Sequence, residues 1–340
     1  MTTMTYDGLR TRGSELLPGF LASAVIAAAA SFLSEHYGAP VMLFALLLGM
    51  AMNFLAVEGK CKPGIEFTAR EVLRIGVALL GIRITFGQIA ALGWEPVLLV
   101  IFSVALTIAI SVVVARWLGF NPLFGLLSGG ATAICGASAA LALAAALPAH
   151  PGKEKATLFT VIGVSAFSTI AMILYPMIVN AFNLNPVAAG IFLGGTIHDV
   201  AQVVGAGYSM GQETGDTATV IKLMRVAMLL PIILIAATIT RSRYAAEGNA
   251  ASGERPPLLP WFAVAFVVLA AINSTGFVPK TVATFGNDLS RWCLIIAISA
   301  LGMKTQLKEL ASVGIKPVAL MVGETVFLAA LVLGVLKWGF

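Results

Sequence analysis

Charged side chains are scarce in this chain of 340 residues. Asp, Glu, Lys and Arg make up only 11% of it, whereas hydrophobic residues make up 59% and the mean hydropathy is +0.96. A soluble domain carries about 25% of these charged residues. The chain therefore cannot cover a water-facing surface, which excludes a disordered protein, a nucleic-acid-binding module and a secreted disulfide scaffold.

Cysteine and cofactor motifs are also rare. Cys61, Cys135 and Cys293 form no CxxC pair and show no metal-ligand spacing, so we expect free thiols. No GxxxxGK[ST] sequence and no HExxH cluster occurs. The sequence therefore predicts no cofactor, no metal site and no enzymatic activity.

Long apolar runs fill most of the chain, and each crossing of a bilayer by a helix needs about 20 such residues. The runs predict an all-α polytopic membrane protein with about 11 transmembrane helices. Residues 1–15 are expected to be a cytoplasmic segment, 16–340 a single transmembrane domain, and 241–257 its only sizeable polar loop. The expected spans are 16–34, 38–57, 70–92, 96–116, 121–147, 156–180, 187–208, 217–240, 258–276, 281–303 and 316–338.

The distribution of Lys and Arg predicts the orientation. Alternating crossings put 13 of the 21 basic residues on the side of the N-terminus and eight on the other, the latter including Lys153, Lys155, Lys222 and Arg225. Because cytoplasmic loops carry the excess of basic residues, the N-terminus is predicted to be cytoplasmic.

An internal repeat is visible at a shift of 221 residues. Leu80-Gly81 aligns with Leu301-Gly302 and Pro96-Val97 with Pro317-Val318, and ten of 30 positions agree without a gap. The copies cover about 38–118 and 258–338. They lie seven spans apart, an odd number, so their orientations in the membrane are opposite. Inverted repeats are typical of secondary transporters; an old duplication kept for packing is the alternative.

Two polar pairs accompany the repeat. Arg83 matches Lys304, and both are candidate gate residues unless they merely extend their charges to the membrane surface. Asn53 and Asn273 occupy similar places one helix earlier and are candidate substrate-lining residues.

Two of the expected spans, 121–147 and 187–208, contain interruptions. Each has a Gly-Gly pair, followed by small polar residues, in the middle of an apolar run. Glycine destabilises a helix interior by about 1 kcal/mol relative to alanine, and loosened backbone in lipid must line protein or a water-filled cavity. The free N–H groups of two half-helices would bind an anion. Close helix packing through small residues is the alternative interpretation.

The candidate substrate-binding residues follow from these interruptions and from the repeat. They are Gly129, Gly130, Thr132, Cys135, Gly136, Ser138, Gly195, Thr196, Gln202, Asn53 and Asn273.

His198 and Asp199 are the candidate coupling residues. Imidazole titrates near neutral pH, and a carboxylate at the bilayer centre costs several kcal/mol unless it has a partner or a function. Glu324 and Arg225 are weaker candidates, interpreted as members of structural ion pairs or as interfacial residues. As simple crossings, the two interrupted spans would run parallel to each other.

The segments GGATAICGASAA at 129–140 and GGTIHDVAQVVGAG at 194–207 resemble the two hallmark segments of the YeiH-type family of bacterial inner-membrane proteins, which is named for sulfate export. The resemblance extends from about Leu16 to Trp338. It implies an inner-membrane location and sulfate or an organosulfonate as substrate. It also implies a distant likeness to the bile-acid symporter and cation/proton antiporter group, which has inverted repeats and broken helices.

The leading functional hypothesis is a secondary transporter of a small anion that works by alternating access and is driven by protons. A sodium- or proton-coupled cation antiporter is the alternative within the same class. An intramembrane enzyme using His198 and Asp199, and a membrane scaffold or receptor without transport, are rivals from other classes. The expected partners are a small anionic solute, the lipid bilayer, a coupling proton or Na⁺, and a second copy in a homodimer.

Overall fold

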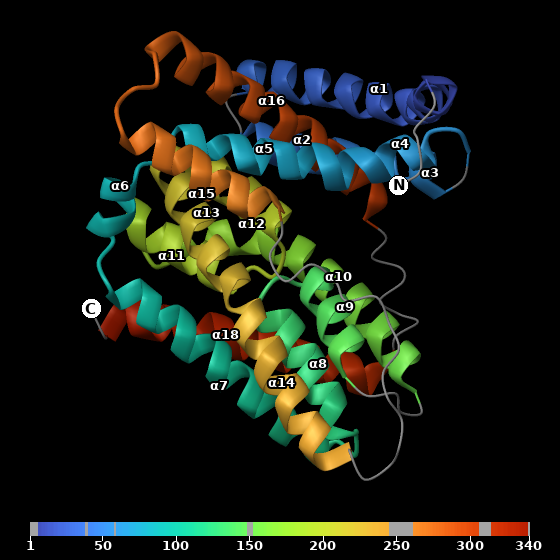
Figure 1. Cartoon of the computed structure of the whole chain (residues 1–340), viewed down its shortest axis with the longest axis vertical. Helices are drawn as coiled ribbons and strands as arrows, with labels where there is room; N and C mark the ends of the chain where they lie inside the picture. Colours follow the sequence, from blue (N-terminus) through green and yellow to red (C-terminus); the bar gives the residue numbers. More distant parts are fainter. Residues whose placement is uncertain are drawn as a thin grey trace. The chain divides into compact units, whose positions relative to one another are not determined.

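The computed structural model describes residues 6–37, 40–57, 59–147, 152–244, 261–305 and 314–338. Within these ranges every regular element is a helix (Figure 1). Five of the helices are long and apolar enough to cross a membrane, and three shorter apolar helices accompany them. The prediction of an all-α polytopic membrane protein is therefore confirmed.

The chain forms two compact units, each built from separate stretches of sequence. The first comprises Met1–Ile89, Tyr208–Met210 and Trp261–Gln306; the second comprises Ala90–Gly207, Gly211–Pro260 and Leu307–Phe340. The expectation was one domain over 16–340. Because each unit takes segments from both halves of the chain, neither is made from one repeat copy alone.

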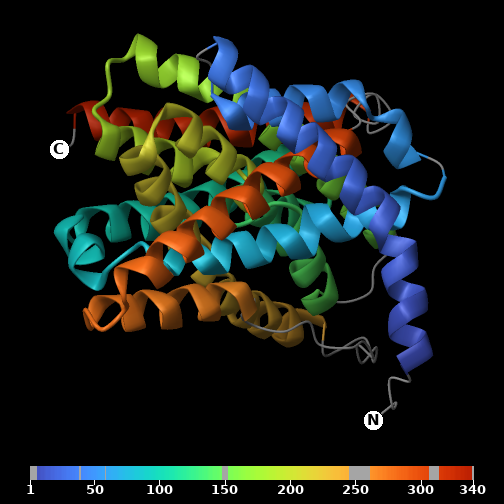
Figure 2. The ribbon, with the colours of Figure 1, turned by 90° about the horizontal axis from the view of Figure 1, so that it is seen from above.

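In the first unit, helices surround a helical stretch, residues 62–82, whose winding changes from α to π, back to α and then to 3₁₀. Its helices are α1 (Tyr6–Tyr37), α2 (Val41–Ala51), α3 (Phe54–Val57), α4 (Lys62–Phe67), a π-turn (Thr68–Val72), α5 (Leu73–Leu79), a 3₁₀ turn (Leu80–Ile82), α15 (Trp261–Ser274) and α16 (Lys280–Lys304). The short α6 (Phe86–Ala91) contains the boundary between the units. The long α1 packs against α2, α4 and α16 (Figure 2).

The repeat seen in the sequence recurs as two equivalent helix contacts in this unit. Gly302 of α16 lies so close to α2 that an added Cβ would be 2.3 Å from the Leu46 carbonyl oxygen. Gly81 meets α15 in the same way, with a Cβ 2.3 Å from the Phe266 carbonyl oxygen. The two glycines are 221 residues apart and their carbonyl partners, Leu46 and Phe266, are 220 apart, so the contacts follow the sequence repeat to within one residue. Each copy therefore packs one of its helices against the other copy.

The repeat-related asparagines bind across the same two contacts. The Asn53 side-chain amide donates to the carbonyl oxygens of Met303 (2.6 Å) and Thr305 (3.3 Å), at the end of α16. The Asn273 amide donates to the Ile84 carbonyl oxygen (3.5 Å), at the equivalent end of the first copy. Both asparagines therefore serve as donors to helix-end carbonyl groups.

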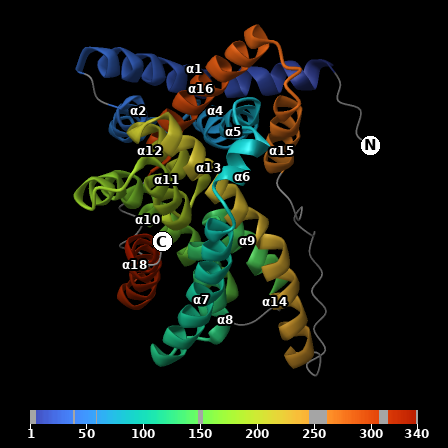
Figure 3. The same ribbon diagram turned by 90° about the vertical axis from the view of Figure 1, so that its left-hand side faces the viewer.

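The second unit contains the interrupted segments. Its helices are α7 (Glu95–Trp117), α8 (Pro122–Ala133), α9 (Ala137–Ala146), α10 (Lys153–Ala181), α11 (Pro186–Thr196), α12 (Val200–Met210), α13 (Gln212–Ala227), α14 (Leu229–Tyr244) and α18 (Ile315–Trp338). The last three residues of α12 belong to the first unit. Helices α7 and α8 lie side by side (Figure 3).

The first interrupted segment is a helical hairpin. Helix α8 ends at Ala133, a turn follows, and α9 folds back along it. A Cβ on Gly130, just before the turn, would lie 2.4 Å from the Leu143 side chain in the second turn of α9. Leu123 and Leu127 share a buried cluster with Leu143. The predicted interruption is confirmed, but the two halves do not continue in one direction.

The second interrupted segment is a hairpin as well. Gly190 of α11 and Gly207 of α12 lie on opposite sides of the break. Added Cβ atoms on both would approach the same Thr214 carbonyl oxygen of α13, at 2.9 and 3.4 Å. Helix α12 therefore returns toward the side from which α11 enters.

Helix α18 shows the direction of the first hairpin. Phe124, near the start of α8, shares a buried cluster with Leu320 of α18. One turn further along both helices, the Ser128 hydroxyl donates to the Glu324 carboxylate (2.7 Å). Helix α8 therefore runs parallel to α18 and reaches its middle.

The second hairpin approaches from the other end of α18. Gly195 of α11 lies against Val332, with an added Cβ 3.5 Å away. Three residues later His198 contacts Thr325 (2.9 Å). Helix α11 is therefore antiparallel to α18 and to α8. As simple crossings the two segments would run parallel; they are antiparallel because each enters the unit and turns back.

The two hairpins also begin with the same sequence signature, which lay outside the 221-residue repeat. Asn121 caps α8 by accepting from the Leu123 N–H (2.9 Å), and Asn185 caps α11 by accepting from the Ala188 N–H (2.8 Å). A proline follows each asparagine at the first helical position. The Asn-Pro pairs and the Gly-Gly pairs together mark the hairpins as a second structural repeat.

We predict that Gly302→Ala destabilises the protein by about 1–3 kcal/mol, because the new Cβ collides with the backbone of α2. Gly323→Ala is the matched control: its Cβ meets no atom within 4 Å, and alanine favours a helix by up to about 1 kcal/mol. Thermal unfolding of the detergent-purified variants measures the difference. Equal melting temperatures for Gly302→Ala and wild type would contradict the close contact.

Candidate functional site

The tips of the two hairpins touch at the turns 134–136 and 197–199, which we call the junction. Gly136 has φ +63°, a left-handed conformation that favours glycine. A Cβ on it would lie 3.5 Å from the His198 carbonyl oxygen and 3.6 Å from the Asp199 Cβ. Four helix ends therefore converge, two C-terminal (α8 and α11) and two N-terminal (α9 and α12).

Arg225 of α13 binds the C-terminal ends of α8 and α11, the first helix of each hairpin. Its Nε donates to the Ala133 carbonyl oxygen (2.7 Å), and one terminal nitrogen donates to the Thr132 carbonyl oxygen (2.9 Å). The other terminal nitrogen donates to the carbonyl oxygens of Gly194 (3.0 Å) and Ile197 (3.1 Å). The guanidinium fork thus joins the two arms, and the side chain is fully buried.

Lys222 lies one turn earlier on α13 and binds the turns themselves. Its ammonium donates to the carbonyl oxygens of Ile134 (2.7 Å), Ile197 (2.9 Å) and His198. It too is fully buried. Because the last carbonyl groups of a helix have no intrahelical donors and carry partial negative charge, two cations here satisfy both requirements.

These contacts correct the sequence interpretation of two residues. Lys222 and Arg225 were counted as basic residues of one membrane side, and Arg225 was interpreted as interfacial or half of an ion pair. Both instead lie in the interior and bind carbonyl groups. Their spacing of three residues in an otherwise apolar stretch, which puts both on one helix face, is the signal that identifies them.

Asp199 occupies the N-terminal end of α12. Its carboxylate accepts from the Val200 N–H (2.7 Å), and its own N–H donates to the Ser168 hydroxyl of α10 (3.0 Å). It is half-buried and close enough to Lys222 to interact electrostatically. Asp199 therefore caps a helix and contributes negative charge at the junction.

His198 joins the junction to α18. Its Nδ1 lies 3.1 Å from the Thr132 carbonyl oxygen, and its Nε2 lies 2.9 Å from the Thr325 hydroxyl. A carbonyl oxygen can only accept, so Nδ1 carries a proton. The Thr325 hydroxyl also lies 2.8 Å from the Met321 carbonyl oxygen, so its single proton is shared between that oxygen and the contact with Nε2. The ring is fully buried with both nitrogens engaged.

Glu324 of α18 lies beside the first hairpin with three hydroxyl donors. One carboxylate oxygen accepts from Ser111 and from Ser128 (2.7 Å), and the other accepts from Thr132 (2.9 Å). Its side chain is 4% exposed. From the sequence alone Glu324 is a weak candidate, because a single carboxylate in a span does not reveal which hydroxyls surround it.

Most of the predicted site residues lie in these two hairpins. They are Gly129, Gly130, Thr132, Cys135, Gly136, Gly195, Thr196, His198, Asp199 and Gln202, all buried except Asp199. Gln202 donates to the Thr169 hydroxyl (3.4 Å), and its side-chain oxygen has no partner among the described residues. Ser138 differs, because it is exposed on α9.

The remaining predicted residues lie in the first unit. Asn53 and Asn273 bind helix-end carbonyl groups there, as described above. Arg83 lies over the Tyr208 ring, 5.4 Å from its centre, and Lys304 is exposed at the end of α16. All four belong to the first unit, whereas the junction belongs to the second. Cys61, Cys135 and Cys293 are free thiols, as predicted.

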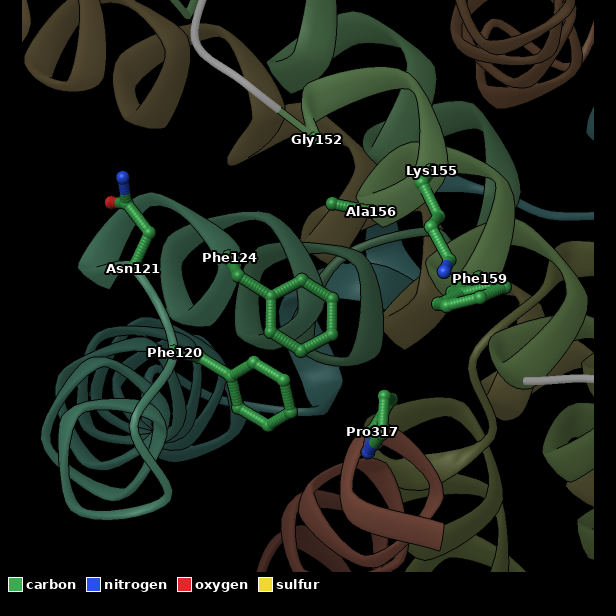
Figure 4. A pocket seen from close by; sticks show the side chains of 8 residues that line it. All are labelled: Phe120, Asn121, Phe124, Gly152, Lys155, Ala156, Phe159 and Pro317. Atoms are coloured by element: carbon green, nitrogen blue, oxygen red, sulfur yellow. The ribbon is translucent and has the colours of Figure 1, made fainter. Parts of the chain in front are cut away.

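A cavity of about 320 Å³ opens beside the first hairpin (Figure 4). Lys155 extends over the Phe159 ring on one side of it (5.3 Å), and the rings of Phe120 and Phe124 lie on another. Phe124 also belongs to the buried cluster that contains Leu320. Because Ser128 and Glu324 lie one turn further along the same two helices, these two apolar side chains separate the cavity from the carboxylate.

Comparison with known proteins identifies the family. The model of the family described as conserved hypothetical protein 698 matches residues 18–321. A UPF0324 membrane protein of Chlorobaculum tepidum is 57% identical over 97% of this chain and 91% of its own length. The UPF0324 membrane protein TauZ of Paracoccus denitrificans is 54% identical over 93% of both chains. A UPF0324 membrane protein of Rhizobium meliloti is 51% identical over 93% of this chain and 91% of its own.

The chain belongs to the UPF0324 membrane protein family. This is the YeiH-type family that the two glycine-rich segments resemble, so that prediction is confirmed. No solved structure matches the chain. The two hairpins and the junction are therefore read from this UPF0324 protein itself.

We predict that Arg225→Ala destabilises the protein by about 3–5 kcal/mol, because four buried carbonyl groups lose their donor. Arg225→Lys keeps the charge but cannot span both arms, so its loss should be intermediate. Arg116→Ala, at an exposed position on α7, is the control and should leave stability unchanged. Denaturant unfolding in detergent micelles measures all three. A neutral Arg225→Ala variant would show that the guanidinium does not hold the hairpins together.

Proposed function

We propose that this protein is a secondary transporter of a small anion that works by alternating access. The observation that carries the proposal is the junction, where two opposed hairpins meet at the middle of α18. Non-helical backbone at membrane depth is tolerated only where it is enclosed by protein or lines a cavity. Sites of this construction, at the interface of inverted repeats, are where secondary transporters bind their solutes.

The charge of the junction supports an anion as the solute. Lys222 and Arg225 contribute two buried positive charges, and the N-terminal ends of α9 and α12 contribute partial positive charge from free N–H groups. A cation entering the junction would meet both side chains, which already occupy the carbonyl oxygens that it would need. The same geometry therefore disfavours the cation-antiporter alternative.

The buried polar groups support transport over a purely structural role. Charged side chains inside a membrane are costly and mark solute or proton pathways. Four such residues, His198, Lys222, Arg225 and Glu324, are buried in one unit. The cavity at Lys155 and Phe159 provides an approach from one end, and the Phe124–Leu320 layer is the barrier that alternating access must open.

The hairpins also strengthen the proposed orientation. Because the first hairpin returns to the side it entered from, Lys153 and Lys155 lie on the same side as Arg116. Lys222 and Arg225 are buried and belong to neither side. The basic residues left on the outer side are Arg83, Lys280, Arg291 and Lys337. The larger excess of Lys and Arg on the side of the N-terminus supports a cytoplasmic N-terminus in the bacterial inner membrane.

Sulfate and organosulfonates are the substrates that we propose, following the family resemblance. Both are small and carry their charge on oxygens that accept from N–H groups and cations. We expect purified protein in proteoliposomes to exchange internal for external radiolabelled sulfate or a short alkylsulfonate, and not to carry Na⁺. Flux of Na⁺ without flux of any anion would overturn the proposal in favour of the antiporter.

Asp199→Asn tests whether the junction charge matters for transport. Asparagine caps a helix about as well as aspartate, so the melting temperature should change little. The sulfate concentration that gives half-maximal exchange should fall at least about tenfold, because the positive charge of Lys222 is then no longer offset. Asp288→Asn, exposed on α16, is the control. Unchanged exchange by a stable Asp199→Asn variant would indicate that Asp199 serves only as a cap.

A further inference from the structure

Glu324 is a buried carboxylate whose donors are neutral. Its three donors are the hydroxyls of Ser111 on α7 and of Ser128 and Thr132 on α8. In the described ranges no Lys, Arg or His lies within ion-pair distance of it. A carboxylate at membrane depth without a cation is costly when ionised, and hydroxyl donors offset part of that cost. Both its ionised and its neutral form can therefore be accommodated.

The surroundings contain an alternative acceptor for one of these donors. The Ser111 hydroxyl lies 2.7 Å from the Gly125 carbonyl oxygen as well as against Glu324. When hydronium transfers a proton to the carboxylate, an O–H bond of hydronium breaks, an O–H bond forms on Glu324, and water leaves. The carboxyl group becomes a donor and loses accepting capacity. Ser111 can then turn to Gly125, and the new carboxyl O–H can donate to a serine oxygen.

Thr132 connects Glu324 to the junction. Its hydroxyl binds the carboxylate, while its carbonyl oxygen accepts from Arg225 (2.9 Å) and from His198 (3.1 Å). The next residue on α18, Thr325, binds the other side of the His198 ring. A change at Glu324 therefore acts directly on a residue in the last turn of α8 that holds both the guanidinium and the imidazole.

The formal charges give this connection a direction. With Glu324 ionised, its charge and that of Asp199 balance Lys222 and Arg225. Protonation of Glu324 leaves one net positive charge around the junction, which favours entry of an anion. Proton and anion binding are then positively coupled, and the coupling is reciprocal.

Other titratable groups near Glu324 are less suited to carry the proton. No titratable side chain comes from α8 or α11, and those of α7 and α10 lie at the helix ends apart from Tyr175. His198 shares the Thr132 carbonyl with Arg225, so a positive charge on its ring would face an existing cation. The 221-residue shift maps Glu324 onto Ser103, so the carboxylate occurs in one copy only.

From this geometry we propose that Glu324, in its cluster of Ser111, Ser128 and Thr132, is the proton-binding site that couples a pH gradient to anion transport. The proposal rests on the proposed anion-transport function. It moves the coupling role from His198 and Asp199 to a residue on α18.

The experiment compares wild type, Glu324→Gln and Glu324→Asp in proteoliposomes with radiolabelled sulfate. Glutamine resembles the protonated form, so we expect sulfate–sulfate exchange to persist, whereas acceleration of uptake by an imposed pH gradient should be lost, by at least about tenfold. Aspartate keeps a titratable group and should retain part of the acceleration. Glu213→Gln, exposed on α13, is the control and should behave like wild type.

Infrared difference spectroscopy on the same proteins gives a readout that needs no transport. All 16 Asp and Glu residues contribute to the protonated-carboxyl band. One component of this band should titrate with pH in wild type and in Glu213→Gln and be missing in Glu324→Gln. If Glu324→Gln does not fold, Glu324→Asp still tests the assignment, because the position of its protonated-carboxyl band should shift relative to wild type.

The outcomes separate the two proposals. Gradient-driven uptake that survives in Glu324→Gln but is lost in His198→Gln would overturn the assignment to Glu324 while leaving anion transport intact. If no pH gradient accelerates sulfate exchange even by the wild-type protein, the assignment to Glu324 is also overturned, while anion transport stands. Absence of any anion exchange in wild type would overturn the proposed function, and the infrared band would still show whether Glu324 binds a proton.

Discussion

The structure of the second unit depends on donors for the backbone carbonyl groups of two short helices. Helices α8 and α11 stop midway along α18, where water cannot satisfy their last carbonyl groups. Arg225 and Lys222 supply seven hydrogen bonds to these groups and to the turns that follow. Without these two cations, opposed hairpins would be an unfavourable arrangement in a membrane.

The same interaction makes the junction electrostatically special. Cations introduced to satisfy carbonyl groups also leave positive charge beside the free N–H groups of α9 and α12. Asp199 and Glu324 offset that charge from two different helices, one as a cap and one within a group of hydroxyls. Structural stabilisation and anion attraction thus arise from one set of side chains.

Similar segments recur in both units. In the first unit, Gly81 and Gly302 pack equivalent helix pairs of the two copies together. In the second unit, α8 runs parallel to α18 and α11 runs antiparallel to it. The first hairpin follows α7 in sequence, whereas the second precedes α15, and the Asn-Pro and Gly-Gly pairs that the hairpins share lie outside the 221-residue shift.

Composition and local pattern were sufficient to predict an all-α membrane protein and the positions of both interruptions, because apolar length and Gly-Gly pairs are local properties. The family followed from the resemblance of the two glycine-rich segments. They were insufficient to predict that each interruption is a turn, since that depends on contacts such as Gly130 with Leu143. The roles of Lys222, Arg225 and Glu324 were also decided only by tertiary structure. Their partners lie tens to hundreds of residues away in sequence, and a charge in an apolar segment does not reveal which distant groups surround it.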